Sequence, residues 1–178
     1  MLMISLKELP HSSQHDHAHR LLKECLRLCG IEYNEDTGIA FGTYGKPSLS
    51  DYPDVHYNLS HANGITVCLI SGCECGADAE KVRPYRPKVM KRAFSESEAE
   101  LVENAPESER DLLFFRIWTL KESYVKALGI GVSYPLKTAE FLIKDNGIVT
   151  NVKGFDFRQY ILKEGGFVVS LCFKKRSV

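Results

Sequence analysis

The sequence lacks an excess of charge of either sign, because 23 lysines and arginines balance 23 aspartates and glutamates over 178 residues. A balanced chain has no overall field that would attract nucleic acid or a membrane surface, and we expect neither as a partner. The sequence also lacks an apolar run long enough to cross a membrane. Its first apolar run meets Lys7 and Glu8 too early for a signal peptide, so we expect a cytoplasmic protein.

Although the chain has six cysteines, it lacks any Cys-x-x-Cys pair. The patterns typical of zinc-binding and thioredoxin-like sites are therefore absent. Cys25 and Cys29 fall within a helical pattern and Cys68 within an apolar strand pattern, where free cysteines pack as small apolar side chains. We expect reduced structural thiols.

What the sequence does have is the composition of an ordinary globular domain, with 44% hydrophobic and 26% charged residues. Its length suffices for one domain or for two small halves packed together. Strand and helix patterns mix without a regular β-α-β alternation, which predicts an α+β fold. The patterns predict strands over 1–6, 55–60, 65–71 and 76–82, and C-terminal strands with turns at Asp145–Gly147 and Gly165–Gly166. They predict one helix from Ser12 or Ser13 to Gly30 and another over 108–128, with a capping box at Ser95 and Glu98. A surface loop is expected over 41–54.

The stretch GADAEKVRP, residues 76–84, follows the apolar run ITVCLIS and contains two acids two positions apart. If the chain stays extended, Asp78 and Glu80 point to the same face of the strand. Two like charges placed side by side repel each other and require compensation. A divalent cation would compensate this repulsion. Taken alone, however, the pair favours the other interpretation, in which the strand end runs into solvent and water hydrates both acids.

A second cluster lies on the long predicted helix, in FFRIWTLKESYVKALG. Trp118, Glu122 and Lys126 follow one another at i, i+4 spacing and therefore share one helix face, with Lys121 at its edge. By itself, the spacing favours an exposed helix with an ordinary glutamate–lysine pair, worth about 0.3–0.5 kcal/mol.

A third cluster is YNLSHANG, in which Ser60 and His61 stand where a predicted strand meets a tight turn. A hydroxyl and backbone N–H groups at such a turn are able to face an anion. Turn chemistry and a surface histidine explain the same residues, because a nucleophile–base pair requires a spatial geometry that the sequence does not establish. The stretch YGKP, residues 44–47, is typical of any turn.

Taken in order, five motifs resemble those of the Sfp-type 4′-phosphopantetheinyl transferases, in the Sfp/holo-acyl-carrier-protein synthase superfamily. The family pattern joins G-(I/V)-D-x-E to W-x-x-K-E-(S/A)-x-x-K further along the chain, and the second part is the more specific. The resemblance extends from about residue 15 to the C-terminus. Its motifs are YGKP at 44–47, YNLSH at 57–61, GADAEKVRP at 76–84, FSESE at 94–98 and WTLKESYVKALGIG at 118–131.

The resemblance implies a single domain over residues 1–178 with two pseudo-symmetric halves, about 1–85 and 86–178. Each half would be a small, mainly antiparallel sheet packed with helices, with coenzyme A in the cleft between them. Larger members carry both halves in one chain, so a monomer is expected. The implied metal is Mg²⁺, which prefers oxygen ligands and is usually shared with substrate phosphates; its ligands would be Asp78, Glu80 and Glu122.

The resemblance also implies contacts to coenzyme A. Lys126 would neutralise the pyrophosphate, and Lys121 would support the phosphate electrostatics. Arg20 would recognise the 3′-phosphate, a role that suits a bidentate donor, and the loop over 44–49 would line the adenine side. The residues implied to bind coenzyme A are Arg20, Lys46, Ser60, His61, Lys121 and Lys126.

The implied reaction transfers 4′-phosphopantetheine from coenzyme A to a serine of an apo acyl or peptidyl carrier protein and releases 3′,5′-ADP. Mg²⁺ and Lys126 would stabilise the charge that builds on the phosphate oxygens. The expected catalytic residues are Asp78, Glu122 and Lys126, with Glu122 or a metal-linked water as the general base. Glu98 is a second candidate base, although its capping-box role is favoured.

Two features stand outside this interpretation. His11, His15 and His19 would share one helical face, and three imidazoles are able to hold a transition metal. No acid or cysteine completes that set, so the spacing alone does not favour a metal there. The basic segment RPYRPKVMKR, residues 83–92, fits either an acidic carrier protein or a solvated face.

Two other functions fit the same residues. A catalytically degenerate relative would hold coenzyme A or a carrier protein without turnover. A Mg²⁺-dependent hydrolase of a nucleoside diphosphate derivative would use the same metal and lysine, although no residue is evidently dedicated to positioning water. Tight coenzyme A binding without transfer would mark the first, and release of 3′,5′-ADP without a carrier would mark the second.

Overall fold

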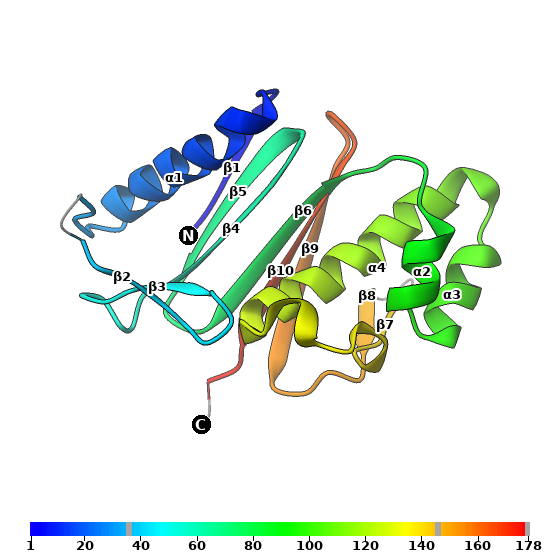
Figure 1. Ribbon diagram of the computed structural model, residues 1–178. Coiled ribbons are helices and arrows are strands. Elements are labelled where there is room, and N and C mark those ends of the chain that lie inside the picture. The colour runs from blue at the N-terminus through cyan, green and yellow to red at the C-terminus, as the bar shows by residue number, and fades with distance from the viewer. Residues whose placement is uncertain (35–36, 145–146, 177–178) are drawn as a thin grey trace.

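The computed structural model describes residues 1–34, 37–144 and 147–176 (Figure 1). Two three-stranded antiparallel sheets stand side by side, and β4 of the first lies next to β6 of the second. The first sheet has the order β1 (Leu2–Lys7), β5 (Gly64–Ser71), β4 (His56–Ala62), and the second has the order β6 (Cys75–Lys81), β10 (Phe167–Lys174), β9 (Phe155–Leu162).

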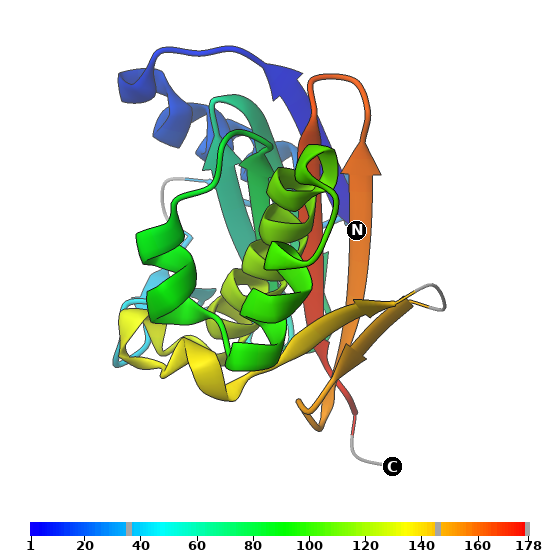
Figure 2. The ribbon, with the colours of Figure 1, turned by 90° about the vertical axis from the view of Figure 1, so that its right-hand side faces the viewer.

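Each sheet is covered by one long helix. Helix α1 (His11–Leu28) packs on the first sheet, and α4 (Glu107–Leu128) packs on β6 and β10 of the second. Figure 2 shows α2 (Pro87–Ala93) and α3 (Glu96–Glu103) beside α4. The remaining elements are the pairs β2 (Ile39–Phe41) with β3 (Pro47–Leu49) and β7 (Phe141–Lys144) with β8 (Gly147–Thr150), and the 3₁₀ turns Gly131–Ser133 and Leu136–Thr138.

The core has three parts because β5 and β10 are buried on both faces. Ile65 and Val67 of β5 meet Val169 of β10 between the two sheets. Cys68, next to Val67 and therefore on the opposite face, packs under α1. In the same way, Val168 of β10 packs under α4. Burial on both faces explains why these strands are continuous apolar runs in the sequence.

The α+β class is confirmed, as are the capping box and the end of the long helix. The Ser95 side chain accepts from the N–H of Glu98, and the Glu98 carboxylate accepts from the N–H of Ser95. Helix α4 ends at Gly129, whose positive φ of 69° suits glycine. The predicted turn at Gly165–Gly166 also has positive φ at both glycines, while Asp145 and Asn146 of the other predicted turn lie outside the described residues.

Two local predictions were wrong. Helix α1 begins at His11, directly after Pro10, so Ser12 and Ser13 lie in its first turn and neither is the N-cap. The predicted surface loop over 41–54 contains β3, which pairs with β2. The segment 83–92, for which the sequence patterns predicted no element, contains most of α2, because a proline at the first helical position does not oppose a helix.

The sheets also divide the chain earlier than residue 85. Strand β6 precedes that point, yet it pairs with β10 of the C-terminal half, in a register that places Asp78 opposite Ser170. The change from the first sheet to the second therefore falls between Ser71 and Cys75. None of the described helices is long and apolar enough to cross a membrane, and the six cysteines are free thiols.

Candidate functional site

The two sheets are joined through side chains where β4 meets β6. The N–H groups of Ala77 and Ala79 point away from β10 and need acceptors, because an unpaired buried N–H is costly. Asn58 Oδ1 accepts from the Ala77 N–H at 2.8 Å, and Ser60 Oγ accepts from the Ala79 N–H at 3.1 Å. Asp78 lies between these two bonds and is only 6% exposed.

Asp78, Ser60 and Lys126 form a connected polar cluster at this junction. Lys126 Nζ donates to Asp78 Oδ1 at 2.7 Å and to Ser60 Oγ at 3.0 Å. The Ser60 hydroxyl donates to the same Asp78 oxygen at 3.1 Å. Asp78 Oδ2 is buried and has no hydrogen-bond partner among the described residues. A buried carboxylate oxygen without a donor is costly, and an added cation or donor would satisfy it.

Gly76 explains how α4 reaches this cluster. It precedes Asp78 by two positions and therefore faces the same side of β6. A Cβ at Gly76 would overlap the Ser123 carbonyl oxygen and the Ala127 nitrogen of α4. Only a residue without a side chain allows the helix to lie so close. The close approach brings the helix face that carries Glu122 and Lys126 over the acids of β6.

Glu122 sits in this group as a partly buried carboxyl. Burial first, and then the nearby charges of Asp78 and Glu80, raise its pKa to about 7, while Lys126 opposes them. Both the burial and the like charges disfavour the ionised form. A carboxyl with such a pKa is able to accept and release a proton near neutral pH.

Glu80 completes the set of three acids but is held to one side. Its Oε2 accepts from Arg83 Nη1 at 2.8 Å, in an ion pair in which the Arg83 side chain is 52% and the Glu80 side chain 21% exposed. In the described part of the chain, no three His, Cys, Asp or Glu side chains converge closely enough to hold a metal by themselves. The three carboxylates nevertheless offer the oxygen donors that a hard divalent cation requires.

A cleft of about 890 Å³ borders this group of residues. Glu122 and Lys126 line it together with Asn58 of β4 and Trp118 of α4. The turn over 44–47, residues of α2, and Gly129, Gly131 and residues 134–136 also line it. A cavity of this size, with a few converging polar groups, is typical of a small-molecule site.

Lys46 lines the same cleft, but its ammonium group donates hydrogen bonds to backbone carbonyl oxygens. Its Nζ donates to the carbonyl oxygens of Ala127 at 2.7 Å and Cys75 at 3.1 Å. A Cβ at Gly129 would meet the Lys46 methylene groups. Lys46 therefore fastens the 44–47 turn to the ends of β6 and α4, and its predicted contact with coenzyme A stays a prediction.

The structure contradicts the predicted phosphate role of Lys121. Its side chain is fully buried, and Nζ forms a 2.7 Å ion pair with Glu98 Oε2. The same ammonium donates to the carbonyl oxygens of Leu136 at 2.9 Å and Ala139 at 2.5 Å. Adjacent helix positions diverge by about 100°, so Lys121 points into the protein while Glu122 points into the cleft.

Arg20 and His61 lie at different distances from the cluster. Arg20 is exposed on α1 and is not among the residues that line the cleft. His61 is exposed beside Ser60, and its pKa is lowered first by partial burial, then by Lys126, His15 and His11. His61 is therefore within electrostatic range of Lys126. The predicted roles of both residues stay predictions.

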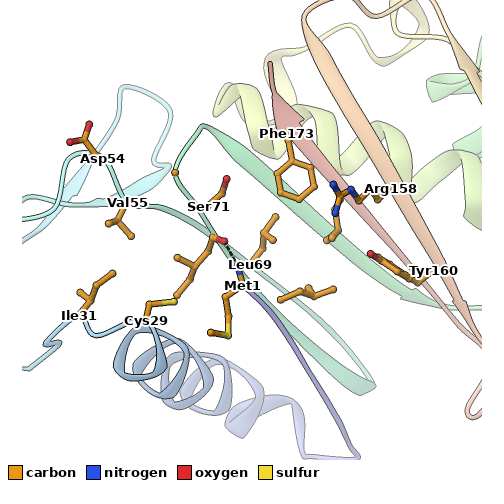
Figure 3. A pocket seen from close by; sticks show the side chains of 14 residues that line it. Met1, Cys29, Ile31, Asp54, Val55, Leu69, Ser71, Arg158, Tyr160 and Phe173 are labelled. Carbon is orange, nitrogen blue, oxygen red and sulfur yellow. Dashed lines mark hydrogen bonds between the residues drawn. The ribbon is translucent and has the colours of Figure 1, made fainter. Parts of the chain in front are cut away.

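A second cavity shares no lining residue with the cleft. It measures about 520 Å³ and lies between β1, β5 and the end of α1 on one side and β9 and β10 on the other (Figure 3). Met1, Leu69, Tyr160 and Phe173 line it, with Arg158 above the Phe173 ring. Because it contains no cluster of acids or histidines, the cleft is the stronger candidate for chemistry.

Comparison with known proteins identifies the family. The family model for the 4′-phosphopantetheinyl transferase superfamily matches residues 74–172, more than half of the chain. The chain belongs to this superfamily. The matched region contains Asp78, Glu80, Glu122 and Lys126, and the resemblance that the sequence motifs indicated is confirmed.

Individual members of the superfamily are similar to this chain over part of their length. A 4′-phosphopantetheinyl transferase of Bacillus subtilis is 37% identical over 65% of this chain and 53% of that protein. The 4′-phosphopantetheinyl transferase Sfp of Bacillus subtilis strain 168 is 33% identical over 75% of this chain and 62% of that protein. The chain thus spans between half and two thirds of these relatives.

Solved structures of the superfamily show lower similarity. The holo-[acyl-carrier-protein] synthase of Thermotoga maritima is 24% identical with a TM-score of 0.47, over 58% of this chain and 64% of that chain. A holo-(acyl-carrier-protein) synthase of Bacillus anthracis, solved in complex with CoA (3′,5′-ADP), is 19% identical with a TM-score of 0.47, over 58% of this chain and 97% of that chain.

Proposed function

We propose that this protein transfers the 4′-phosphopantetheine group of coenzyme A to a serine of an apo acyl or peptidyl carrier protein and releases 3′,5′-ADP. The observation that carries the proposal is the polar cluster in which Lys126 contacts Asp78 and Ser60, beside a cleft that Glu122 and Lys126 line. Membership of the superfamily supports it. We further propose that residues 1–178 act as one transferase domain and as a monomer.

In the proposed reaction, the carrier serine oxygen forms a bond to the phosphorus that bears pantetheine. The bond from that phosphorus to the bridging pyrophosphate oxygen breaks, and 3′,5′-ADP leaves with the electron pair. Glu122 is the carboxylate that lines the cleft and receives the serine proton. The nucleophile comes from the partner, so no activated serine or cysteine is required in this chain.

Lys126 supplies positive charge at the point where the pyrophosphate would lie. Asp78 and Ser60 hold its ammonium at 2.7 and 3.0 Å, so the charge is oriented before a ligand arrives. Preorganised charge stabilises developing negative charge without reorganisation during the reaction. Ser60 therefore acts chiefly by positioning Lys126 and Asp78, and its predicted direct contact with phosphate is secondary in this proposal.

The acids also fit the Mg²⁺ expected for such a transfer. The unpartnered Asp78 Oδ2 and the raised pKa of Glu122 both indicate a site that lacks positive charge. We propose Asp78, Glu80 and Glu122 as the residues that hold the ion. When bound, Mg²⁺ would act as a Lewis acid on phosphate oxygens. Mg²⁺ needs few protein ligands, because it usually keeps waters and binds substrate phosphates.

The wall of the cleft formed by α2 suits an acidic carrier protein. Lys88 and Arg92 line the cleft, and both are exposed, as is Lys91. Charge complementarity of this kind speeds encounter more than it raises affinity. We therefore propose that the carrier approaches over α2 and presents its serine to the cleft from that side.

The test measures 3′,5′-ADP released from coenzyme A in Mg²⁺, with and without an apo carrier protein. Release that requires the carrier supports transfer. Release without the carrier would indicate a hydrolase, and coenzyme A binding without release would indicate a binding module. Asp78→Asn and Glu122→Gln should abolish release, whereas Glu24→Gln, an acid-to-amide change on the exposed face of α1, should not.

A further inference from the structure

Helix α1 presents two histidines as a matched pair. His15 and His19 are one helical turn apart, and their Nε2 atoms lie 3.2 Å from each other. Their ring centroids are 4.4 Å apart, and the rings are tilted by 45°. His17, between them in sequence, points elsewhere and hydrogen-bonds Ser5 Oγ at 2.9 Å. The atoms that approach each other are the Nε2 nitrogens of the two rings.

The separation of the two Nε2 atoms matches what one metal ion requires. Zinc binds histidine nitrogen at about 2.0–2.1 Å in a tetrahedral arrangement, which places two nitrogens of one ion about 3.3–3.4 Å apart. The two Nε2 atoms are therefore within about 0.2 Å of that spacing. Because helix positions i and i+4 fix the separation, the backbone need not move when the ion binds.

The charge state of the pair also suits a metal. Two imidazoles share a hydrogen bond only if at least one of them is neutral, and metals bind the neutral form. His15 Nδ1 lies 3.9 Å from Asp16 Oδ1, on the side of the ring away from His19. At that distance the carboxylate places negative charge beside the pair without a hydrogen bond to the ring.

Histidine ligands favour a different class of metal from the Mg²⁺ expected at the acids. Imidazole suits zinc, copper and nickel, whereas Mg²⁺ prefers oxygen. Among the described residues, no set of three His, Cys, Asp or Glu is close enough to form a complete site. The protein would therefore supply two ligands, and water would complete the coordination.

We propose that His15 and His19 form a two-histidine site for a divalent transition metal of the zinc and copper class on the solvent-facing side of α1. The site goes beyond the proposed transfer reaction and uses none of its acids. His15 lies within electrostatic range of His61, which is itself within range of Lys126, so a bound ion adds positive charge on that side of the molecule.

The experiment titrates Zn²⁺ into the protein of residues 1–178 at neutral pH by calorimetry, in excess Mg²⁺ so that oxygen sites are occupied. His15→Gln and His19→Gln should each weaken the binding of one equivalent by about 10²-fold, because each turns a chelate into a single contact. His17→Gln is the matched control on the same helix, and its affinity should equal that of the unsubstituted protein.

Nuclear magnetic resonance of the imidazole nitrogens identifies the ligands directly. Zn²⁺ should shift the Nε2 signals of His15 and His19 and leave those of His17 unchanged. The proposal is overturned if the unsubstituted protein binds no Zn²⁺, or if all four proteins bind it equally, as they would through cysteine thiols. Equal loss in His17→Gln would also overturn it, because His17 bonds to Ser5 and not to the pair.

Discussion

Gly76 of β6 and Ser123 of α4 are in such close contact that a methyl group on Gly76 would overlap the Ser123 carbonyl oxygen. This single approach sets the depth at which the helix lies on the second sheet. It places Lys126 within 2.7 Å of Asp78 and Glu122 close enough for Asp78 to raise its pKa. The site therefore depends on a residue that takes no part in its chemistry.

Gly76→Ala should lower both stability and activity. Overpacking of this kind costs about 1–3 kcal/mol and occasionally more, and the helix must move away from β6 to make room. Gly42→Ala is the control, because a Cβ there would meet the Lys46 carbonyl oxygen at an ordinary 3.6 Å. Urea unfolding and the transfer rate would be measured for both. Unchanged values for Gly76→Ala would contradict the packing described here.

The buried pair of Lys121 and Glu98 should behave as a structural unit. Removing one partner of a buried ion pair costs about 3–5 kcal/mol, because the other charge is left uncompensated. Lys121→Met should therefore be strongly destabilising, and Lys121→Met with Glu98→Gln should cost less than the sum of the single changes. Urea unfolding of the double-mutant cycle measures this coupling. Additive costs would show that the two residues act independently.

The exposed pair of Arg27 and Glu24 gives the matched comparison for that cycle. It is also an ion pair at 2.7 Å, but both side chains are largely in water. Arg27→Met should change the free energy of unfolding little, since surface ion pairs contribute little. A loss as large as that of Lys121→Met would mean that burial is not the cause.

The raised pKa of Glu122 predicts how stability depends on pH in the absence of divalent cations. Between its ordinary pKa of 4.5 and its folded pKa of about 7, the folded state holds a proton that the unfolded state has lost. Stability from this group is therefore fully present below pH 4.5 and declines as pH rises to about 7. Glu122→Gln should remove this decline.

The measurement is the free energy of unfolding at a series of pH values for the unsubstituted protein and Glu122→Gln. The stability of the variant relative to the unsubstituted protein should grow with pH up to about 7 and then level off. A difference that stays constant across the series would show that Glu122 titrates at its ordinary pKa.

Mg²⁺ should raise the melting temperature at pH 8, and EDTA should reverse the effect. A ligand that binds only the folded state stabilises it by about 2.7 kcal/mol at 100 times its dissociation constant. Asp78→Asn and Glu122→Gln should abolish the shift, and Glu24→Gln should keep it. Equal shifts in all four proteins would place the ion somewhere other than at these acids.

The strand and helix patterns predicted much of the fold but less of the site. Spacing in β6 correctly placed Asp78 and Glu80 on one face, and spacing in α4 placed Glu122 with Lys126. Both rest on local periodicity, which a sequence records directly. The contact between the two elements depends on packing at Gly76, and no local pattern contains it.

Lys121 shows where such reasoning fails. It stands next to Glu122 in the motif, and a lysine is almost never fully buried unless it is paired. Its partner Glu98 is 23 positions away, and the link forms only when α3 packs against α4. The bond of Ser60 to Asp78 is of the same kind, since it joins β4 to β6 across the two sheets.

The measurement that tests the central claim most directly is the intact mass of apo carrier proteins. A panel of acyl and peptidyl carriers would be incubated with this protein, coenzyme A and Mg²⁺, beside reactions that contain EDTA. The account predicts that at least one carrier gains the mass of a phosphopantetheine group, and that EDTA or Glu122→Gln prevents the gain. A panel in which no carrier gains that mass, from a protein that binds coenzyme A, would contradict it.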